Sequence, residues 1–268
     1  MAVARAEDTV DAEDAVARFT RLMVEPEPRL DVAMLVIATG AEPGLDEDRW
    51  LAELDRLAVG VDSVNGLMRR LFVEEAFAGN VEEYYDPRNS LLHRVLSRRL
   101  GIPISLAIVC MEVGRRAGVP MEGIGMPGHF LLRPAGTTDV YYDPFTAGAT
   151  LDIDGCRTLY RAVTGSAEGF DPELLAPSPV PSMLVRVLQN LRGAYRMRRR
   201  AGDLERVLRM RAALPGVTTA DLVELGSAMG QQGRWRDGAR LLDVAATTRP
   251  DDAELLARAA RALRANLN

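Results

Sequence analysis

Apolar residues recur at helical spacing through the first 80 positions of the chain. Segments 11–23, 30–41, 45–61 and 63–80 place apolar side chains three and four residues apart, which is the period of an amphipathic helix. The segment at 30–41 is apolar on nearly every side, so we expect that helix to be buried. These segments predict a helical N-terminal subdomain at 1–79.

The pattern changes between residues 80 and 176. A loop and a short helix precede a Gly-Ile-Pro turn, and a longer apolar helix follows that turn. Residues 129–134 and 139–144 are short strand-like runs on either side of a turn-rich segment, which predicts a β-hairpin. Helical spacing returns at 151–165. We therefore predict a mixed core domain at 80–176.

The last part of the chain is helical and partly self-similar. A stretch rich in proline and serine marks a boundary near 176–182. Residues 222–250 fit the 34-residue tetratricopeptide pattern, with Gly226 and Gly238 near its small positions, and a degenerate copy lies one repeat length earlier. We predict a tetratricopeptide-like module at 183–268, with a generic helical bundle as the alternative.

Charge and composition exclude some functions. The chain has 268 residues and a formal net charge of -5, which disfavours nucleic-acid binding as its main task because phosphate neutralisation needs a basic face. An arginine-rich stretch at 196–200 is better explained as a solvated repeat face or a groove for an acidic partner. All 33 basic residues are arginines, so no lysine amine is available as a Schiff-base former or an acyl acceptor.

Nothing in the sequence indicates export, membrane insertion or a bound cofactor. The first residues lack an apolar signal-peptide region, no run of 18 apolar residues occurs, and two cysteines do not make a disulfide framework. We therefore expect a cytoplasmic protein. The spacing of its two histidines suggests no metal site and no cofactor.

The candidate chemistry centres on His129 and Asp143. His129 lies at the start of the first predicted hairpin strand, and Asp143 lies at the end of the second. Because opposed residues on neighbouring strands have close side chains, the two can meet. An aspartate that holds a histidine ring in one tautomer is half of a nucleophilic triad, but such a pair can equally be a satisfied core contact.

A nucleophile would be expected at a helix N-terminus, where the helix dipole favours an anion. The helix after the Gly-Ile-Pro turn has Ser105 in its first turn. Cys110 lies five residues further on, facing another side of the helix among apolar residues, and we interpret it as core packing. Cys156 has the same interpretation.

These motifs resemble a known family. The order of the helix start, the Arg-Arg-Ala-Gly-Val-Pro segment, Gly-His-Phe and Tyr-Tyr-Asp-Pro-Phe is similar to the transglutaminase-like core. The motifs between residues 80 and 148 resemble more narrowly the bacterial SirB-type invasion-regulator branch, which carries a tetratricopeptide tail. The resemblance implies a Cys-His-Asp triad, whose last two positions match His129 and Asp143. The cysteine position falls at Ser105 or Pro103, so thiol catalysis is in doubt.

The same motifs contain candidate binding residues. Tyr85, Asn89 and Tyr142 are candidates for contact with a bound ligand. For Asn89 and Ser90, capping of the helix that follows is the favoured alternative, because both are strong N-cap residue types. We expect His93, on that helix, to be a surface or interface residue and not a ligand.

We expect an α+β fold in three parts. These are a helical N-terminal part, a transglutaminase-like core that carries a small antiparallel sheet, and a C-terminal module of helical repeats. The first functional hypothesis is a non-catalytic descendant of this fold that binds a protein or peptide through its old cleft and its C-terminal repeats. The second is a hydrolase or acyl transferase that uses Ser105, His129 and Asp143. The third, nucleic-acid binding through the arginine-rich helix, is disfavoured by the charge.

Overall fold

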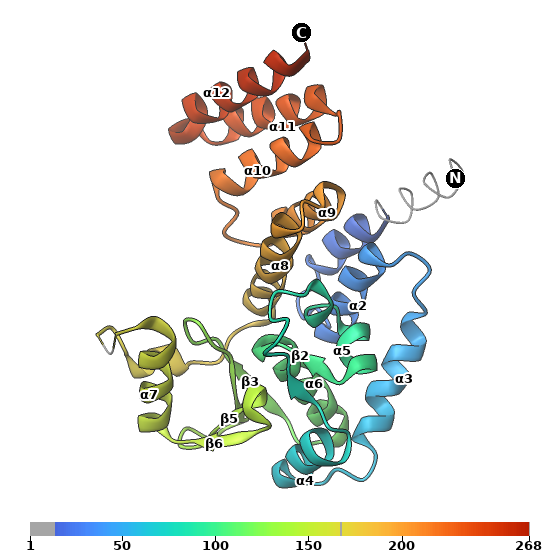
Figure 1. Ribbon diagram of the computed structural model, residues 1–268, viewed down its shortest axis with the longest axis vertical. Helices are drawn as coiled ribbons and strands as arrows, with labels where there is room; N and C mark the ends of the chain where they lie inside the picture. Colours follow the sequence, from blue (N-terminus) through green and yellow to red (C-terminus); the bar gives the residue numbers. More distant parts are fainter. Residues whose placement is uncertain (1–13, 167, 268) are drawn as a thin grey trace. The chain divides into compact units, whose positions relative to one another are not determined.

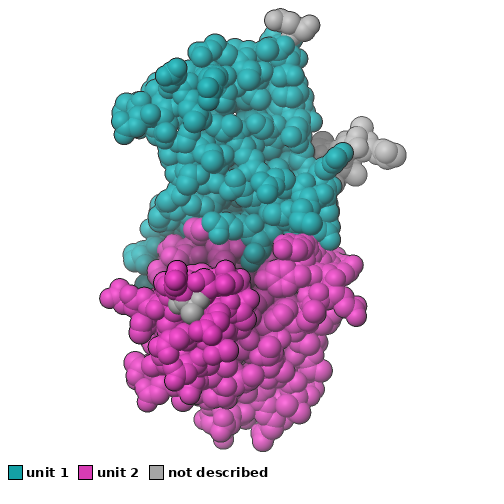
Figure 2. All heavy atoms as spheres, turned by 60° about the vertical axis from the view of Figure 1, so that its left-hand side comes forward, with its two compact units in different colours: residues 1–27, 39–43, 188–268 teal, residues 28–38, 44–187 magenta. Residues whose placement is uncertain are grey.

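The computed structural model describes residues 14–166 and 168–267. Its secondary structure is mixed, with many helices and two small sheets (Figure 1). The chain divides into two compact units, one made of residues 1–27, 39–43 and 188–268 and the other of residues 28–38 and 44–187 (Figure 2). The predicted helical region at 44–79 and the predicted core therefore belong to the same compact unit.

Helices of the first part form where the apolar period predicts them. Residues 14–22 are helical, while the start of that predicted segment, at 11–13, lies outside the described residues. Helix α2 (Leu30–Ala41) is almost entirely buried, and helix α3 (Glu47–Ala58) begins where Asp46 accepts a hydrogen bond of 3.1 Å from the backbone N–H of Arg49. These helix predictions are confirmed.

The predicted helix at 63–80 ends early. Helix α4 (Val64–Met68) continues into a π-helical turn, η1 (Arg69–Glu74), and the chain then enters strand β1 (Ala78–Gly79). Strand β1 pairs in parallel with β2 (Leu100–Gly101), the segment before the Gly-Ile-Pro turn. Because this pairing joins residues 22 positions apart, helical periodicity alone did not predict it.

A central helix and a four-stranded sheet form the core of the second unit. Helix α6 (Pro103–Ala117) is buried over most of its length. The antiparallel sheet has the order β3-β4-β5-β6. Its strands are β3 (Met121–Ile124), β4 (Leu131–Pro134), β5 (Tyr141–Asp143) and β6 (Ala149–Leu151). The predicted hairpin is confirmed as β4 and β5, while β3 and β6 were not predicted.

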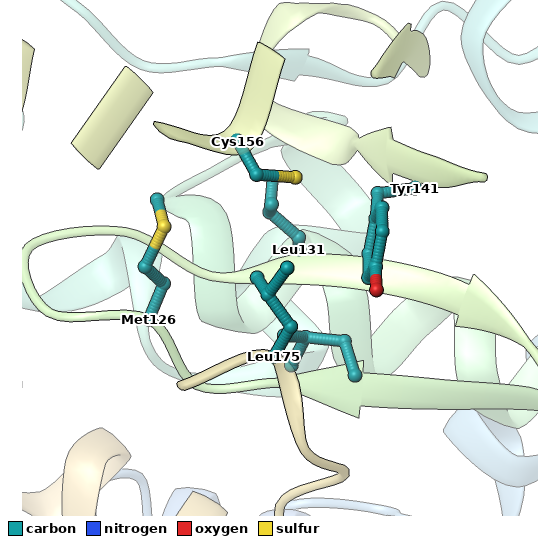
Figure 3. Close-up of a cluster of buried hydrophobic side chains, with 6 residues drawn as sticks. Met126, Leu131, Tyr141, Cys156 and Leu175 are labelled. Atoms are coloured by element: carbon teal, nitrogen blue, oxygen red, sulfur yellow. The ribbon is translucent and has the colours of Figure 1, made fainter. Parts of the chain in front are cut away.

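Helix α7 (Ile153–Thr164) covers one face of this sheet with apolar residues. Figure 3 shows Cys156 of α7 among Met126, Leu131, Tyr141 and Leu175, all of them buried. Burial raises the pKa of the Cys156 thiol to about 11. The predicted packing role of Cys156 is therefore confirmed, and the same cluster fixes Met126 at the start of the turn that carries His129.

The capping predicted for the short helix α5 (Leu92–Arg98) is wrong, and His93 does not lie at the surface. The N-cap residue of α5 is Leu91, and no side chain caps it, so neither Asn89 nor Ser90 has the expected role. His93 is buried, at 3% exposure, and its ring packs edge-on against Trp50 with centroids 5.9 Å apart. Ion pairs join the helices around it: the Arg99 guanidinium binds both Glu53 and Glu75 at 2.7 Å.

The C-terminal part is all helical, from α8 (Val180–Met197) through α9 (Ala201–Ala212), α10 (Thr219–Gly230) and α11 (Trp235–Thr248) to α12 (Ala253–Arg264). From α9 onward, each helix packs against the next one in sequence (Figure 1). Helices α10 and α11 approach very closely, because a Cβ on Gly238 would lie only 2.5 Å from the carbonyl oxygen of Gly226. Glycine is therefore required at this crossing.

Candidate functional site

The start of helix α6 uses the Ser105 hydroxyl for its own hydrogen bonds. Proline at the first helical position suits a helix start, because its missing N–H would have no partner there. The backbone N–H of Ile102 donates to Ser105 Oγ at 3.0 Å, and Oγ donates to the carbonyl of Ile102 at 3.1 Å. Ser105 has no exposed surface. Its hydroxyl therefore stabilises the helix N-terminus from within the core.

His129 and Asp143 form a buried pair. His129 Nε2 lies 2.9 Å from Asp143 Oδ1, and the two residues are 7% and 3% exposed. His129 precedes β4 in a turn closed by a hydrogen bond of 3.1 Å from its backbone N–H to the carbonyl of Met126. Asp143 ends β5. The structure thus brings together these two predicted residues, although His129 lies in a turn and not in the strand itself.

Hydrogen bonds hold Asp143 in its ionised form. Burial opposes ionisation, but the hydrogen bond with His129 and a second one of 2.9 Å from the backbone N–H of Phe145 outweigh it, so the pKa of Asp143 lies below its ordinary value. An ionised Asp143 accepts the proton carried by Nε2. Nδ1 is then the ring nitrogen that remains to accept a proton or a hydrogen bond from a ligand.

An aromatic wall flanks His129. The ring of Phe145 stands edge-on to the imidazole, with centroids 6.2 Å apart, and Tyr84 packs against Phe145 at 5.9 Å. A Cβ on Gly79 would lie 2.5 Å from the Phe145 ring, so only glycine lets β1 pass so close. Tyr85 packs on Tyr84 and is 62% exposed. Tyr84, rather than the predicted Tyr85, is the tyrosine in contact with Phe145.

Asn89 holds the loop that carries these tyrosines. It is fully buried, and its side-chain nitrogen donates to the carbonyls of Glu83 at 2.8 Å and Tyr84 at 3.1 Å. Its side-chain oxygen accepts from Asn80 Nδ2 at 3.0 Å and from Arg98 Nη1 at 3.3 Å. An amide has two donor hydrogens and two acceptor lone pairs, so every one of them is used within the chain.

Among the described residues, no hydrogen bond or ring contact joins the side chain of Tyr142 to this wall. Tyr142 pairs with Leu132 across the ladder and is half-buried. Because side chains alternate along a strand, it faces the side of β5 opposite to Tyr141, which packs in the cluster under α7.

Arg186 of helix α8 is a residue that sequence reasoning did not connect with the site. Its Nη1 donates to the carbonyl of Met126 at 2.9 Å, and its guanidinium carbon lies 5.5 Å from the centre of the Phe130 ring. Met126 and Phe130 bracket His129 in sequence. The residue lies 57 positions after His129, and no local motif around it indicated the contact.

Cys110 is a packing residue. It is 1% exposed inside α6, and burial raises the pKa of its thiol far above the ordinary value. A thiol that stays protonated is a poor nucleophile, so the predicted packing role is confirmed.

The described part of the chain has neither a cluster of metal ligands nor a membrane-spanning helix. No three histidine, cysteine, aspartate or glutamate side chains gather there as metal ligands would. Among the same residues, no helix has both the length and the apolar character needed to cross a membrane.

A family model and several curated proteins match this chain. The model of the transglutaminase-like superfamily matches residues 41–189. A UPF0162 protein of Xylella fastidiosa strain 9a5c is 35% identical over 240 residues, which cover 87% of this chain and 83% of that protein. F-box only protein 21 of Homo sapiens is 34% identical over 122 residues, 42% of this chain and 19% of that protein. No solved structure matches the chain significantly.

Proposed function

Since the chain belongs to the transglutaminase-like superfamily, we propose that it is a non-catalytic member that binds a protein or peptide in a regulatory role. The chain retains the histidine and aspartate of the family's triad as His129 and Asp143, but its described part has no nucleophile aligned with them. We propose the cytoplasm as its location.

The observation that carries the proposal is that the Ser105 hydroxyl is buried and hydrogen-bonded to the backbone. Both hydrogen bonds of its hydroxyl go to Ile102, and the residue has no exposed surface. A serine nucleophile must donate its proton to the histidine, within about 2.6–3.2 Å. The hydroxyl of Ser105 instead donates to a backbone carbonyl, and to attack a substrate it would have to leave a buried helix start. Pro103, the other position equivalent to the family cysteine, has no nucleophilic atom.

The helices of the C-terminal part support a binding role. We propose that residues 183–268 form tetratricopeptide-like repeats, supported by the close crossing of α10 and α11 at Gly226 and Gly238. Between helices α8, α9 and α10 lies a cavity of about 370 Å³. Its lining is arginine-rich: Tyr195, Arg196, Arg199, Arg200, Ala201, Leu204, Glu224, Ala228 and Gln231.

The charges of this cavity favour an acidic partner. Glu224 is paired with Arg192, and Arg200 is paired with Asp203. Arg196 and Arg199 are exposed and have no carboxylate partner among the described residues. Two guanidiniums beside apolar surface suit an acidic peptide segment, because arginine binds carboxylates with strong charge-assisted hydrogen bonds.

A second candidate function rests on the preserved pair. A hydrolase or acyl transferase using Ser105, His129 and Asp143 is favoured by the 2.9 Å bond between His129 and Asp143, which leaves Nδ1 free to act as a base. This alternative requires Ser105 Oγ to break its bonds with Ile102.

A serine-directed fluorophosphonate probe tests the two candidates against each other. Purified protein, Ser105→Ala and His129→Ala are incubated with the probe, and the mass of each is measured. We expect no added mass on any of them. A label on Ser105 that disappears in His129→Ala would establish a working triad and overturn the non-catalytic proposal.

The binding half of the proposal is tested with a fluorescein-labelled hexaglutamate peptide, followed by anisotropy. We expect Arg196→Glu to weaken binding by about tenfold or more, the equivalent of one charge-assisted contact. Arg240→Glu is the matched control, because Arg240 is exposed on α11 and does not line the cavity. Equal loss in both variants would mean that the peptide responds only to net charge.

A further inference from the structure

Arg186 clamps the turn that carries His129. The carbonyl oxygen of Met126 accepts two hydrogen bonds, one of 2.9 Å from Arg186 Nη1 and one of 3.1 Å from the backbone N–H of His129. The guanidinium also lies over the ring of Phe130, the residue that follows His129. Arg186 and His129 are therefore attached to the same backbone atom, and the positive charge is held next to the site.

The charge of Arg186 is not balanced within the described chain. The half-buried guanidinium pairs with no carboxylate there, and its one hydrogen bond goes to a neutral carbonyl. Burial lowers the pKa of Arg186, and only the nearby Tyr84 opposes this. Arg116, whose side chain is only 9% exposed, contrasts with it, because it binds Asp31, Asp55 and Glu112. An unpaired buried cation is costly, so a counter-anion from a ligand would be favourable.

Tyr84 lies near Arg186 and belongs to the aromatic wall beside His129. It interacts electrostatically with Arg186, and its ring packs against Phe145, which in turn packs against the imidazole. No hydrogen bond of the Tyr84 hydroxyl lies within the described residues. A guanidinium has five N–H donors, of which Arg186 uses one, and a phenol hydroxyl has one donor. Arg186 contacts the turn that carries His129, and Tyr84 packs on the Phe145 ring that flanks the imidazole, so unused donors from two segments belong to the surroundings of His129.

We propose that Arg186 and Tyr84 form a subsite for a carboxylate group beside His129. This inference rests on the proposed binding function and adds the chemistry of the group that the site accepts. The planar fork of arginine matches a carboxylate, and the tyrosine hydroxyl supplies a further donor. The carboxylate belongs to an acidic side chain or to a chain terminus, and both sources share this chemistry.

Four small probes separate these sources. N-acetylglutamate α-amide carries only a side-chain carboxylate, and N-acetylalanine carries only a terminal one. N-acetylglutamine amide and N-acetylalanine amide are their uncharged counterparts. Binding of either acid supports the subsite, and the acid that binds identifies the source.

The two histidines provide a local readout. The chain contains only His93 and His129, so a proton–carbon NMR spectrum of the imidazole Cε1–H groups has two signals, which His129→Gln assigns. We expect the acids to shift the His129 signal saturably and to leave that of His93 in place. The amides should leave both in place. An equal response to acid and amide overturns the proposal.

Two substitutions assign the effect to the subsite. Arg186→Gln keeps a donor for the Met126 carbonyl but removes the charge, and it should weaken acid binding by at least about tenfold. Arg157→Gln is the matched control, since Arg157 also lies over a phenylalanine ring, Phe170, at 5.3 Å. Unchanged acid binding in Arg186→Gln overturns the proposal.

The position of the His93 signal reports whether Arg186→Gln is folded. If it is not, Tyr84→Phe decides: acid binding weakened a few-fold supports the subsite, and unchanged binding overturns it. The outcome is separable from the proposed function. A fluorophosphonate label on Ser105 would refute the non-catalytic role without affecting this titration, whereas loss of acid binding without any label refutes only the subsite.

Discussion

Replacing Ser105 by alanine removes the hydrogen-bond acceptor at the start of α6. In the native chain, Oγ accepts the backbone N–H of Ile102 at 3.0 Å, and both residues are buried, at 0% and 2% exposure. Water cannot readily take the place of the hydroxyl at such a position. The substitution therefore leaves a buried N–H without a partner while keeping the rest of the side chain.

The expected cost follows from these contacts. An unsatisfied buried donor costs about 1–3 kcal/mol, and loss of a serine at a helix start costs about 0.5–2 kcal/mol. The better helix propensity of alanine returns a few tenths of a kcal/mol. We expect a net loss of about 1–2 kcal/mol in the free energy of unfolding. With a urea dependence of about 2–3 kcal/mol per molar, the unfolding midpoint should fall by about 0.3–1 M.

Trp50 makes this measurement specific to the unit that contains Ser105. The chain has two tryptophans, Trp50 in that unit and Trp235 in the other. In a Trp235→Phe background, urea unfolding followed by fluorescence reports on Trp50 alone. Ser97→Ala is the control, because Ser97 is exposed on α5, and it should change stability by less than about 0.5 kcal/mol.

A Ser105→Ala variant as stable as the parent protein would contradict this prediction. The Ile102 N–H would then not depend on Oγ, and the hydroxyl would be available for other chemistry. An equally large loss in Ser97→Ala would also contradict it, because the effect would then not be specific to the helix start.

Three further predictions concern the surroundings of the site. Asn89→Ala should destabilise the protein by roughly 2–5 kcal/mol, because it strands several buried polar groups, whereas Asn65→Ala, on the exposed face of α4, should have little effect in the same urea titration. Hydrogen bonds from Arg56, with a further one from Arg99, outweigh burial and lower the pKa of Glu53 from 4.5 to about 2. The contribution of Glu53 to the free energy of unfolding is therefore fully present above about pH 5 and is lost as the pH falls towards 2. Glu53→Gln should therefore reduce stability at pH 7 by up to roughly 3 kcal/mol and much less at pH 2.5, and an equal loss at both would contradict the assignment. Cys110 should resist iodoacetamide at pH 8 in the folded protein and react on unfolding, as mass spectrometry can follow, and rapid labelling of the native thiol would show that it is accessible.

The pattern of residues along the chain determined the local elements. Helices α2, α3, α6 and α7 and the hairpin of β4 and β5 lie where the apolar spacing and the turn predict them. The period of a helix and the turn of a hairpin involve neighbours in sequence, so the sequence alone contains the necessary information. The sequence also predicted that His129 and Asp143 meet, and they lie 2.9 Å apart. The strand register does not explain this contact, because β4 and β5 pair Leu132 with Tyr142 and His129 reaches Asp143 from the turn before β4.

The tertiary structure decided which polar side chains form all their hydrogen bonds within the chain and which lie next to the site. Asn89 was a candidate for ligand contact, but packing directs all its polar atoms to the chain itself. Tyr84 and Tyr85 are adjacent and chemically identical, and only the approach of Phe145 distinguishes them. Arg186 reaches the turn of His129 from 57 residues away. Burial and charge balance depend on every segment packed around a group, and no local pattern records them.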